Sequence, residues 1–164
     1  MTPDPAALDA AIRKAHHLLF AFDGPIRRTD AESPLDAATP TAPYIYEAFT
    51  ACRESGRSVV VISPKTMIDV PNYPDAHDLF GLTTIIAISV ADAIKFLELT
   101  PADCLLVTSS PADIEAAQAA GVPSIGYSRA AGDAAPLVDA GAVTFVYSLA
   151  DVALKLRART ADWN

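Results

Sequence analysis

The chain has 164 residues, of which 51% are hydrophobic, and a formal net charge of −8 at pH 7. This length and composition suit one compact domain with a single sizeable core, and they exclude a second large domain. The excess of 20 Asp and Glu over 12 Lys and Arg makes nucleic acid a poor partner, because an acidic surface repels a phosphate backbone. No apolar run approaches the roughly 20 residues that cross a bilayer, and the first residues do not resemble a secretion signal. We therefore expect a cytoplasmic protein that binds neither nucleic acid nor membranes.

Apolar residues at helical spacing, such as Leu8 and Ile12, predict an introductory helix over about 4–17. A core of alternating strands and helices is expected over about 18–159, with a loose tail at 160–164, so that residues 1–164 form one domain. Continuous apolar runs predict strands that are covered on both faces. These runs are Leu18 to Phe22, Ser58 to Ile62, Thr84 to Ile88, Cys104 to Thr108, Pro123 to Tyr127 and Val143 to Tyr147.

Helical stretches separate the apolar runs: Thr41 to Gly56, Val90 to Leu99, Pro111 to Ala120, Ala134 to Ala140 and Leu149 to Arg159. The first is predicted to begin near Thr41, whose hydroxyl suits a cap, with Pro43 in its first turn. Strands and helices that alternate at this spacing predict a doubly wound parallel sheet, which is a Rossmann-like α/β fold with three layers, α/β/α. Ligands of such sheets bind at the carboxyl ends of the strands, where the winding reverses.

The cysteines and histidines do not suggest a disulfide or a metal site. Cys52 and Cys104 lie far apart in apparently regular segments, which favours buried free thiols. His16, His17 and His77 have no metal-ligand partner at a recognisable spacing, so surface or packing roles are expected.

The segment from Leu18 to Ile26 reads Leu-Leu-Phe-Ala-Phe-Asp-Gly-Pro-Ile and resembles the first motif of the haloacid dehalogenase (HAD) superfamily. In that family the strand leads into Asp-x-Asp-Gly-Thr. The first Asp attacks phosphorus and binds Mg²⁺, and the second is the general acid and base. The resemblance places Ala21 at the nucleophile position and Asp23 at the acid/base position, with Pro25 where the family has Thr. A methyl group can neither attack phosphorus nor bind a cation.

Two further positions correspond to the family's second and third motifs. In the second motif a strand ends in Ser or Thr, whose hydroxyl binds the phosphoryl group, and Ser63 followed by Lys65 matches it. On its own, Ser63 is more simply explained as a turn residue at the end of a strand. Lys65 is explained equally well as a solvated surface amine. The third motif brings a Lys, commonly as Lys-Pro. This pair is absent here and Lys95 is the nearest cation, inside a predicted helix where a solvent-facing charge is the simpler explanation.

The fourth motif of the family, Gly-Asp-Ser-x-x-Asp before a helix, resembles the segment from Thr108 to Asp113, and the helix that follows it matches closely. The Mg²⁺-binding Asp of the motif is Ser109 in this chain. Ser110 and Asp113 remain as possible ligand-binding residues, although Asp113 also suits the first turn of a helix as a complement to the helix dipole. Because Mg²⁺ prefers carboxylate oxygens, the replacement of both family carboxylates predicts no magnesium site, and no cofactor is expected.

The resemblance also implies a capless member of the family. The connections from Gly24 to Ala42 and from Pro64 to Thr83 are too short for a folded cap. In capless members a macromolecular substrate or another subunit covers the open site, so a homo-oligomer or a protein partner is expected there. The apolar stretch from Met67 to Tyr73 suits either a lid on its own domain or an interaction surface.

The motifs support three functional hypotheses to different degrees. The first is a HAD-like pseudoenzyme without Mg²⁺-dependent phosphatase activity, which binds a phosphorylated or other anionic ligand or a protein partner. The second is a HAD-family hydrolase of phosphate esters with an altered, metal-independent mechanism, in which Asp23 activates water. The third, a dinucleotide-binding domain, has no support because no Gly-x-Gly-x-x-Gly follows any predicted strand.

Overall fold

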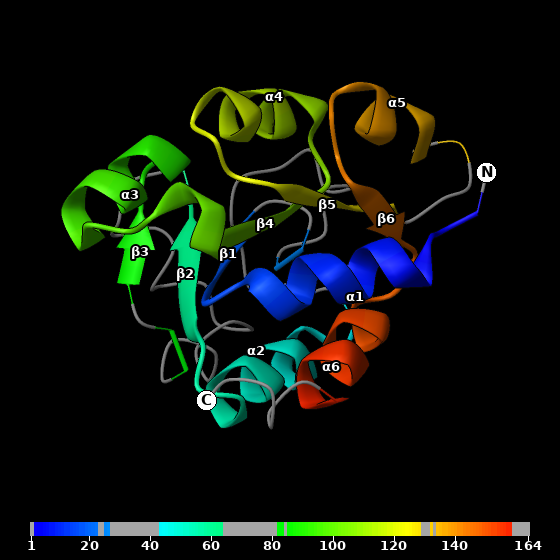
Figure 1. Ribbon diagram of the computed structural model, residues 1–164, viewed down its shortest axis with the longest axis horizontal. Helices are drawn as coiled ribbons and strands as arrows, with labels where there is room; N and C mark the ends of the chain where they lie inside the picture. Colours follow the sequence, from blue (N-terminus) through cyan, green and yellow to red (C-terminus); the bar gives the residue numbers. More distant parts are fainter. Residues whose placement is uncertain are drawn as a thin grey trace, which may run out of the picture.

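A parallel sheet forms the centre of the molecule (Figure 1). The computed structural model describes residues 2–22, 25–26, 43–63, 82–83, 85–128, 132 and 134–158. Within these residues the sheet has six strands in the order β3-β2-β1-β4-β5-β6, and all neighbouring strands are parallel. The strands are β1 (His17–Ala21), β2 (Ser58–Ile62), β3 (Ile85–Ala87), β4 (Cys104–Thr108), β5 (Ser124–Tyr127) and β6 (Thr144–Val146). The winding reverses between β1 and β4, so the predicted doubly wound α/β fold is confirmed.

Helices cover both faces of this sheet (Figure 1). One layer contains α1 (Pro5–Lys14), α2 (Ile45–Glu54) and α6 (Leu149–Ala158), and the other contains α3 (Val90–Leu97), α4 (Pro111–Ala119) and α5 (Ala134–Asp139). A short 3-10 helix, Pro101–Asp103, leads into β4. The described residues form these three layers and no cap domain. No helix among them is both long enough and apolar enough to cross a membrane.

The strands feed two separate cores because successive side chains of a strand point to opposite faces. In β1, Leu18 and Phe20 join the core beneath α1, α2 and α6, whereas Leu19 joins the core beneath α3 and α4. All three side chains are completely buried. Phe20 packs on Phe49 of α2 with ring centroids 4.8 Å apart. Burial of each such side chain stabilises the fold by about 1.5–3 kcal/mol, which explains why both faces of the strands are apolar.

The start of α2 differs from the prediction. The helix begins at Ile45, and the preceding residue Tyr44 occupies the cap position with φ 66° and without a side-chain cap bond. Pro43 therefore lies before the cap and not in the first turn, while Thr41 lies outside the described residues. The sequence suggested that the Thr41 hydroxyl caps the helix, but the residue at the cap position is Tyr44, whose backbone is left-handed.

A buried arginine joins α1 to the sheet. Arg57, which is 2% exposed, immediately precedes β2. Its Nε donates to the carbonyl oxygen of Ala15 at 2.8 Å, and its Nη2 donates to that of Ile12 at 3.0 Å. These carbonyls lie at the end of α1, where the amide of Ala15 also donates to the carbonyl oxygen of Ile12 at 3.1 Å. The backbone of Ala15 is already extended, so the introductory helix is shorter than the predicted span of about 4–17.

The cysteines and histidines take the roles expected of them where they are described. Cys52 and Cys104 are free thiols, and both are buried. His17 begins β1, and its Nδ1 lies 2.6 Å from the hydroxyl oxygen of Ser58 at the start of β2. Burial lowers the pKa of His17. This pair lies at the amino ends of the strands, so it is a packing contact at the edge opposite to the ligand-binding edge of the sheet. His77 lies outside the described residues.

Candidate functional site

A cleft of about 530 Å³ opens at the carboxyl ends of the central strands. It lies where β1 and β4 are neighbours, which is the reversal point at which doubly wound sheets bind ligands. Its lining comes from β1, β2, β4 and the first turns of α3 and α4. The lining residues are Ala21, Phe22, Ile62, Ile88, Ser89, Val90, Leu106, Ser109, Ser110, Asp113 and Ala116.

The floor of the cleft is apolar. Ile62 and Leu106 belong to the core beneath α3 and α4, and Ala21 follows Leu19 of that core by two residues along β1. Ala21 is 4% exposed, so its methyl group is part of a closed surface at the base of the cleft. The position that resembles the family's nucleophile is therefore built into the cleft, but with a side chain that carries no reactive atom.

Ser109 lies on the wall of the cleft directly after β4. Its hydroxyl donates a hydrogen bond of 2.8 Å to the carbonyl oxygen of Tyr127, the last residue of β5. The bond ties the end of β4 to the end of β5, which are paired strands. The hydroxyl hydrogen is thus committed to the backbone at the position where the HAD motif has its metal-binding carboxylate.

Asp113 belongs to a hydrogen-bonded group at the start of α4. Its Oδ2 accepts a bond of 2.8 Å from the hydroxyl of Thr108, and that hydroxyl oxygen accepts a bond of 3.1 Å from the amide of Ser110. Ser110 caps α4, with its hydroxyl oxygen 3.4 Å from the amide nitrogen of Asp113. A carboxylate in the first turn of a helix also complements the helix dipole. The contacts of Asp113 are therefore explained by a role in stabilising the start of α4.

The start of α3 forms the opposite wall. Ser89 caps this helix by accepting a 3.1 Å bond from the amide of Asp92, and Ile88 and Val90 flank it. The sequence interpretation missed these three residues as part of the site. A signal was available, because Ser89 follows the predicted strand over Thr84 to Ile88 and stands at the same edge of the sheet as the other strand ends.

Two other predicted site residues that the structure describes, Ser63 and Lys95, are not part of the cleft lining. Ser63 is buried, and its amide donates to the carbonyl oxygen of Ala87 at 2.9 Å, so its backbone extends the pairing of β2 with β3. Lys95 is exposed on α3 and does not line the cleft, in agreement with a solvent-facing charge. Asp23 and Lys65 lie outside the described residues.

The described lining of the cleft carries little charge. Asp113 is the one charged side chain in the described lining, and no Lys or Arg belongs to it. Mg²⁺ needs several oxygen ligands and net negative charge, which Ala21 and Ser109 do not provide. Among the described residues no group of three or more His, Cys, Asp or Glu is placed to hold a metal. The described residues therefore do not fit the ion that the family uses, and no chemical step is assigned to one.

Comparison with known proteins identifies the fold. No protein-family model and no curated protein matches the sequence. Solved structures do match. A haloacid dehalogenase-like hydrolase from Streptococcus pneumoniae has a TM-score of 0.71 at 10% identity, over 85% of this chain and 97% of its own. A protein from Clostridium acetobutylicum described as a predicted phosphatase has a TM-score of 0.71 at 15% identity, over 87% and 98%. A Thermotoga maritima protein named for β-phosphoglucomutase has a TM-score of 0.71 at 13% identity, over 91% and 100%.

The chain therefore has the fold of the HAD-like hydrolases and phosphatases, as the motif resemblance implied. The likeness extends over nearly the whole length of these three structures. Shared fold does not carry function by itself, and the activity has to be argued from the residues of the cleft.

Proposed function

We propose that this chain is a non-catalytic protein with a HAD-like fold, which acts by binding at the cleft between α3 and α4. One observation carries the proposal. In the cleft, the hydroxyl of Ser109 on the wall is bonded to the carbonyl oxygen of Tyr127, and the side chain of Ala21 at the base is a methyl group. The nucleophile and the metal-binding acid of the family are replaced by groups that the scaffold uses for packing. Loss of a nucleophile alone lowers enzyme rates by many powers of ten.

Of the two ligand classes considered, the lining favours a protein partner. Most of its side chains are apolar, and Ile88 at its edge is 56% exposed, so an apolar side chain of a partner would find an apolar contact there. A phosphorylated ligand would meet Asp113 without a described cation to offset the repulsion. An anionic ligand is the second candidate because the first turns of α3 and α4, capped by Ser89 and Ser110, both reach the cleft.

A turnover assay separates binding from catalysis. Purified wild type and Asp23→Asn are compared on p-nitrophenyl phosphate and a panel of phosphate esters, with Mg²⁺ and with a chelator. We expect no turnover above background and no difference between the two proteins. Mg²⁺-dependent turnover that Asp23→Asn abolishes would contradict the proposal. Metal-independent turnover that the same change abolishes would support the altered hydrolase mechanism instead.

A second experiment tests the cleft as the binding site. Ala116 is exposed and lines the cleft, so Ala116→Arg fills its mouth without disturbing the core. Ala119 is exposed on the same helix outside the lining, which makes Ala119→Arg a matched control. A partner that co-purifies with wild type and Ala119→Arg but not with Ala116→Arg supports the proposal. Titration with inorganic phosphate tests the second candidate, since an anion site would bind it in wild type.

A further inference from the structure

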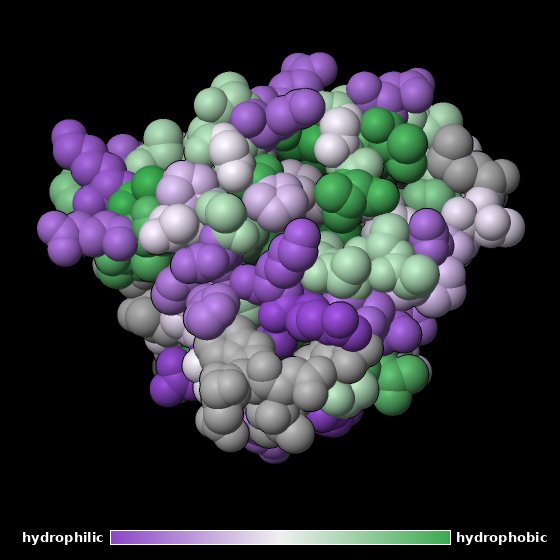
Figure 2. All heavy atoms as spheres, in the orientation of Figure 1, coloured by the Kyte–Doolittle hydropathy of each residue, from purple (hydrophilic) through white to green (hydrophobic). Residues whose placement is uncertain are grey.

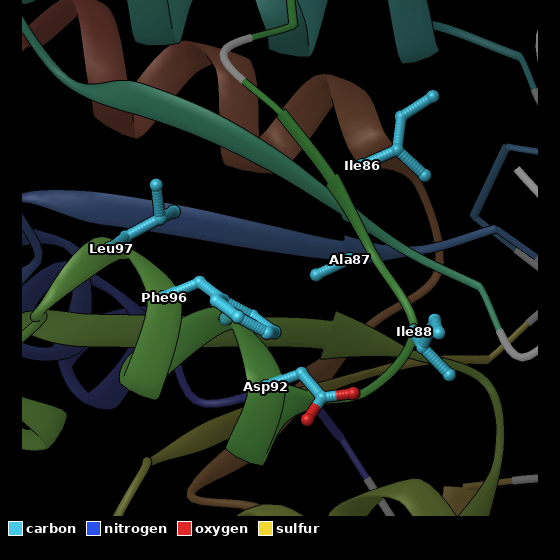
Figure 3. Close-up of a pocket in the computed structure, with 7 residues that line it drawn as sticks. Ile86, Ala87, Ile88, Asp92, Phe96 and Leu97 are labelled. Carbon is cyan, nitrogen blue, oxygen red and sulfur yellow. The ribbon is translucent and has the colours of Figure 1, made fainter.

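A second, smaller depression lies on the other side of Ile88, between β3 and α3 (Figure 3). Its volume is about 180 Å³, which is enough for one or two side chains. We call it the edge groove. Apart from one carboxylate its described lining is apolar, and it consists of Ile86, Ala87, Ile88, Asp92, Ala93, Phe96 and Leu97.

Two large apolar side chains of this groove are unusually exposed. Phe96 is 72% and Ile88 is 56% exposed. Phe96 lies on α3, and in Figure 3 its ring lies below Ala87 in the view, toward the groove. Figure 2 shows hydrophobic surface over α3 next to hydrophilic surface. An aromatic anchor beside an apolar depression is the arrangement that protein-binding sites use.

The groove also lies along β3, the outermost strand of the sheet in the described part of the chain. β3 is the last strand of the sheet, and the Ala87 carbonyl oxygen faces β2, where it accepts from the amide of Ser63. Because successive residues of a strand direct their backbone groups to opposite sides, the N–H and C=O of Ile86 face away from β2. In the described part of the chain no strand pairs with that side.

Ile86 places backbone atoms in the groove. Its side chain packs against the core on the α2 and α6 face, and in Figure 3 it points away from Phe96. It nevertheless belongs to the lining of the groove. What Ile86 presents there is therefore its peptide group, so a ligand in the groove can form backbone hydrogen bonds and fill an apolar pocket at the same time.

Charge decides between the possible occupants. Asp92 is the one charged residue in the described lining, and the chain as a whole carries −8. A second copy of the chain would bring the same negative charge to the contact, whereas a basic segment would be attracted to it. The Asp92 carboxylate is drawn beside Ile88 in Figure 3, at the end of the groove that adjoins the cleft.

We propose that the edge groove binds an extended, basic segment of a partner protein, which adds a strand along Ile86 and inserts an apolar side chain against Phe96. Main-chain bonds supply affinity in this mode, and the pocket selects the alternate side chains of the segment. The proposal goes beyond the proposed function and does not rest on it, because the edge groove lies outside the cleft. Turnover at the cleft would contradict the first proposal and leave this one standing.

A library of displayed random peptides of about seven residues, the length of an ordinary strand, tests the proposal. Selection on wild-type protein is followed by depletion on Phe96→Asp. We expect the enriched peptides to carry apolar residues at every second position, more Lys and Arg than Asp and Glu, and no central Pro. A failure to enrich peptides that depend on Phe96, or enrichment of acidic peptides, would overturn it.

One enriched peptide is then synthesised with a fluorophore, and its binding is measured by fluorescence anisotropy. Phe96→Asp is expected to weaken binding at least about tenfold. Asp92→Asn is expected to weaken it about two- to fivefold, with the loss shrinking at high salt. Leu154→Asp is the matched control, because Leu154 is 65% exposed on α6 in the other layer and its change should have no effect.

Two further measurements distinguish strand addition from binding through side chains alone and from self-association. Two peptides are made, each methylated at the backbone N–H of one of two consecutive central residues. Strand addition should lose binding with one of them and keep it with the other, because successive N–H groups face opposite sides. Binding that neither methylation weakens would rule out strand addition. Sedimentation velocity of the wild type reports self-association. A dimer that Phe96→Asp dissociates would assign the groove to a second copy and overturn the proposal. Thermal unfolding of each variant verifies that the exposed substitutions leave the protein folded.

Discussion

The hydroxyl of Thr108, the last residue of β4, donates a 2.8 Å hydrogen bond to the carboxylate of Asp113 in the first turn of α4. The same hydroxyl oxygen accepts from the amide of Ser110, so the Thr108 side chain bonds both the turn between β4 and α4 and the first turn of α4. Thr108 is completely buried. The surviving acid of the HAD-like fourth motif is thereby held by the scaffold, which gives it a structural reason to be there that is independent of catalysis.

Removal of this hydroxyl should destabilise the protein more than removal of the charge it contacts. Thr108→Val leaves the Ser110 amide and the Asp113 carboxylate without their partner, which costs about 1–3 kcal/mol of the free energy of unfolding. Asp113→Asn keeps an oxygen that can accept the bond and loses the helix-dipole interaction, about 0.3–1 kcal/mol. Urea unfolding monitored by circular dichroism measures both. The reverse order of effects would show that the charge matters more than the bond.

The buried Arg57 should be a major contributor to stability. Arg57→Met keeps most of the volume but leaves the carbonyl oxygens of Ile12 and Ala15 without these donors, so we expect a loss of about 3 kcal/mol. Arg13→Met is the control. Arg13 forms an exposed pair with Asp9 at 3.3 Å, and exposed pairs contribute about 0–1 kcal/mol. Equal midpoints of urea unfolding for the two variants would contradict the assigned role of Arg57.

Restoring both family carboxylates should restore a response to magnesium. Ala21→Asp places a carboxylate at a position that is 4% exposed, so it lowers stability by several kcal/mol in the absence of a cation. With Ser109→Asp added, the site has two carboxylates and Mg²⁺ should raise the melting temperature of the double variant. The wild type and each single variant should not respond. A wild-type shift as large as that of the double variant would mean that another set of residues binds the ion.

The two buried thiols predict a loss of stability at alkaline pH. Burial raises the pKa of Cys52 to about 12 and that of Cys104 to about 11, from an ordinary value of 9.0. Above about pH 9 the unfolded chain releases these protons while the folded chain keeps them, so the free energy of unfolding falls as pH rises toward the folded values. Each thiol accounts for at most about 1.4 kcal/mol per pH unit.

The measurement compares urea unfolding of the wild type and of Cys52→Ala/Cys104→Ala at about pH 8 and about pH 10. The double variant should lose less stability between the two conditions, because other titrating groups are common to both proteins. In the native wild type neither thiol should react with Ellman's reagent at about pH 8, and both should react in denaturant. Rapid reaction of the native protein would show that a thiol is accessible.

Local patterns in the sequence were sufficient to predict the layers of the fold. The runs that were predicted to end at Phe22, Ile62 and Thr108 are apolar because parallel strands between two helix layers are buried on both faces. The same positions, compared with the HAD motifs, pointed to the carboxyl edge of the sheet as the site. Ala21, Ser109, Ser110 and Asp113 do meet in one cleft there, because the ends of parallel strands share an edge.

The start of α2 shows where local patterns were insufficient. Thr41 and Pro43 have the composition of a helix start, yet the helix begins after a left-handed Tyr44. Lys95, by contrast, is exposed on α3, as the simpler interpretation of the sequence predicted. Proximity in sequence does not determine which face of a helix a residue occupies once the helix is packed on a sheet.

The sequence by itself determined the alternation of strands and helices and the chemical losses at Ala21 and Ser109, since both depend on residue type and short-range spacing. Only the tertiary structure decided that the Ser109 hydroxyl is bonded to Tyr127, that Arg57 donates to carbonyl oxygens at the end of α1, and that Phe96 and Ile86 line the same groove. These contacts join elements that are distant in sequence. Their geometry is set by how the layers pack, which residue periodicity does not encode.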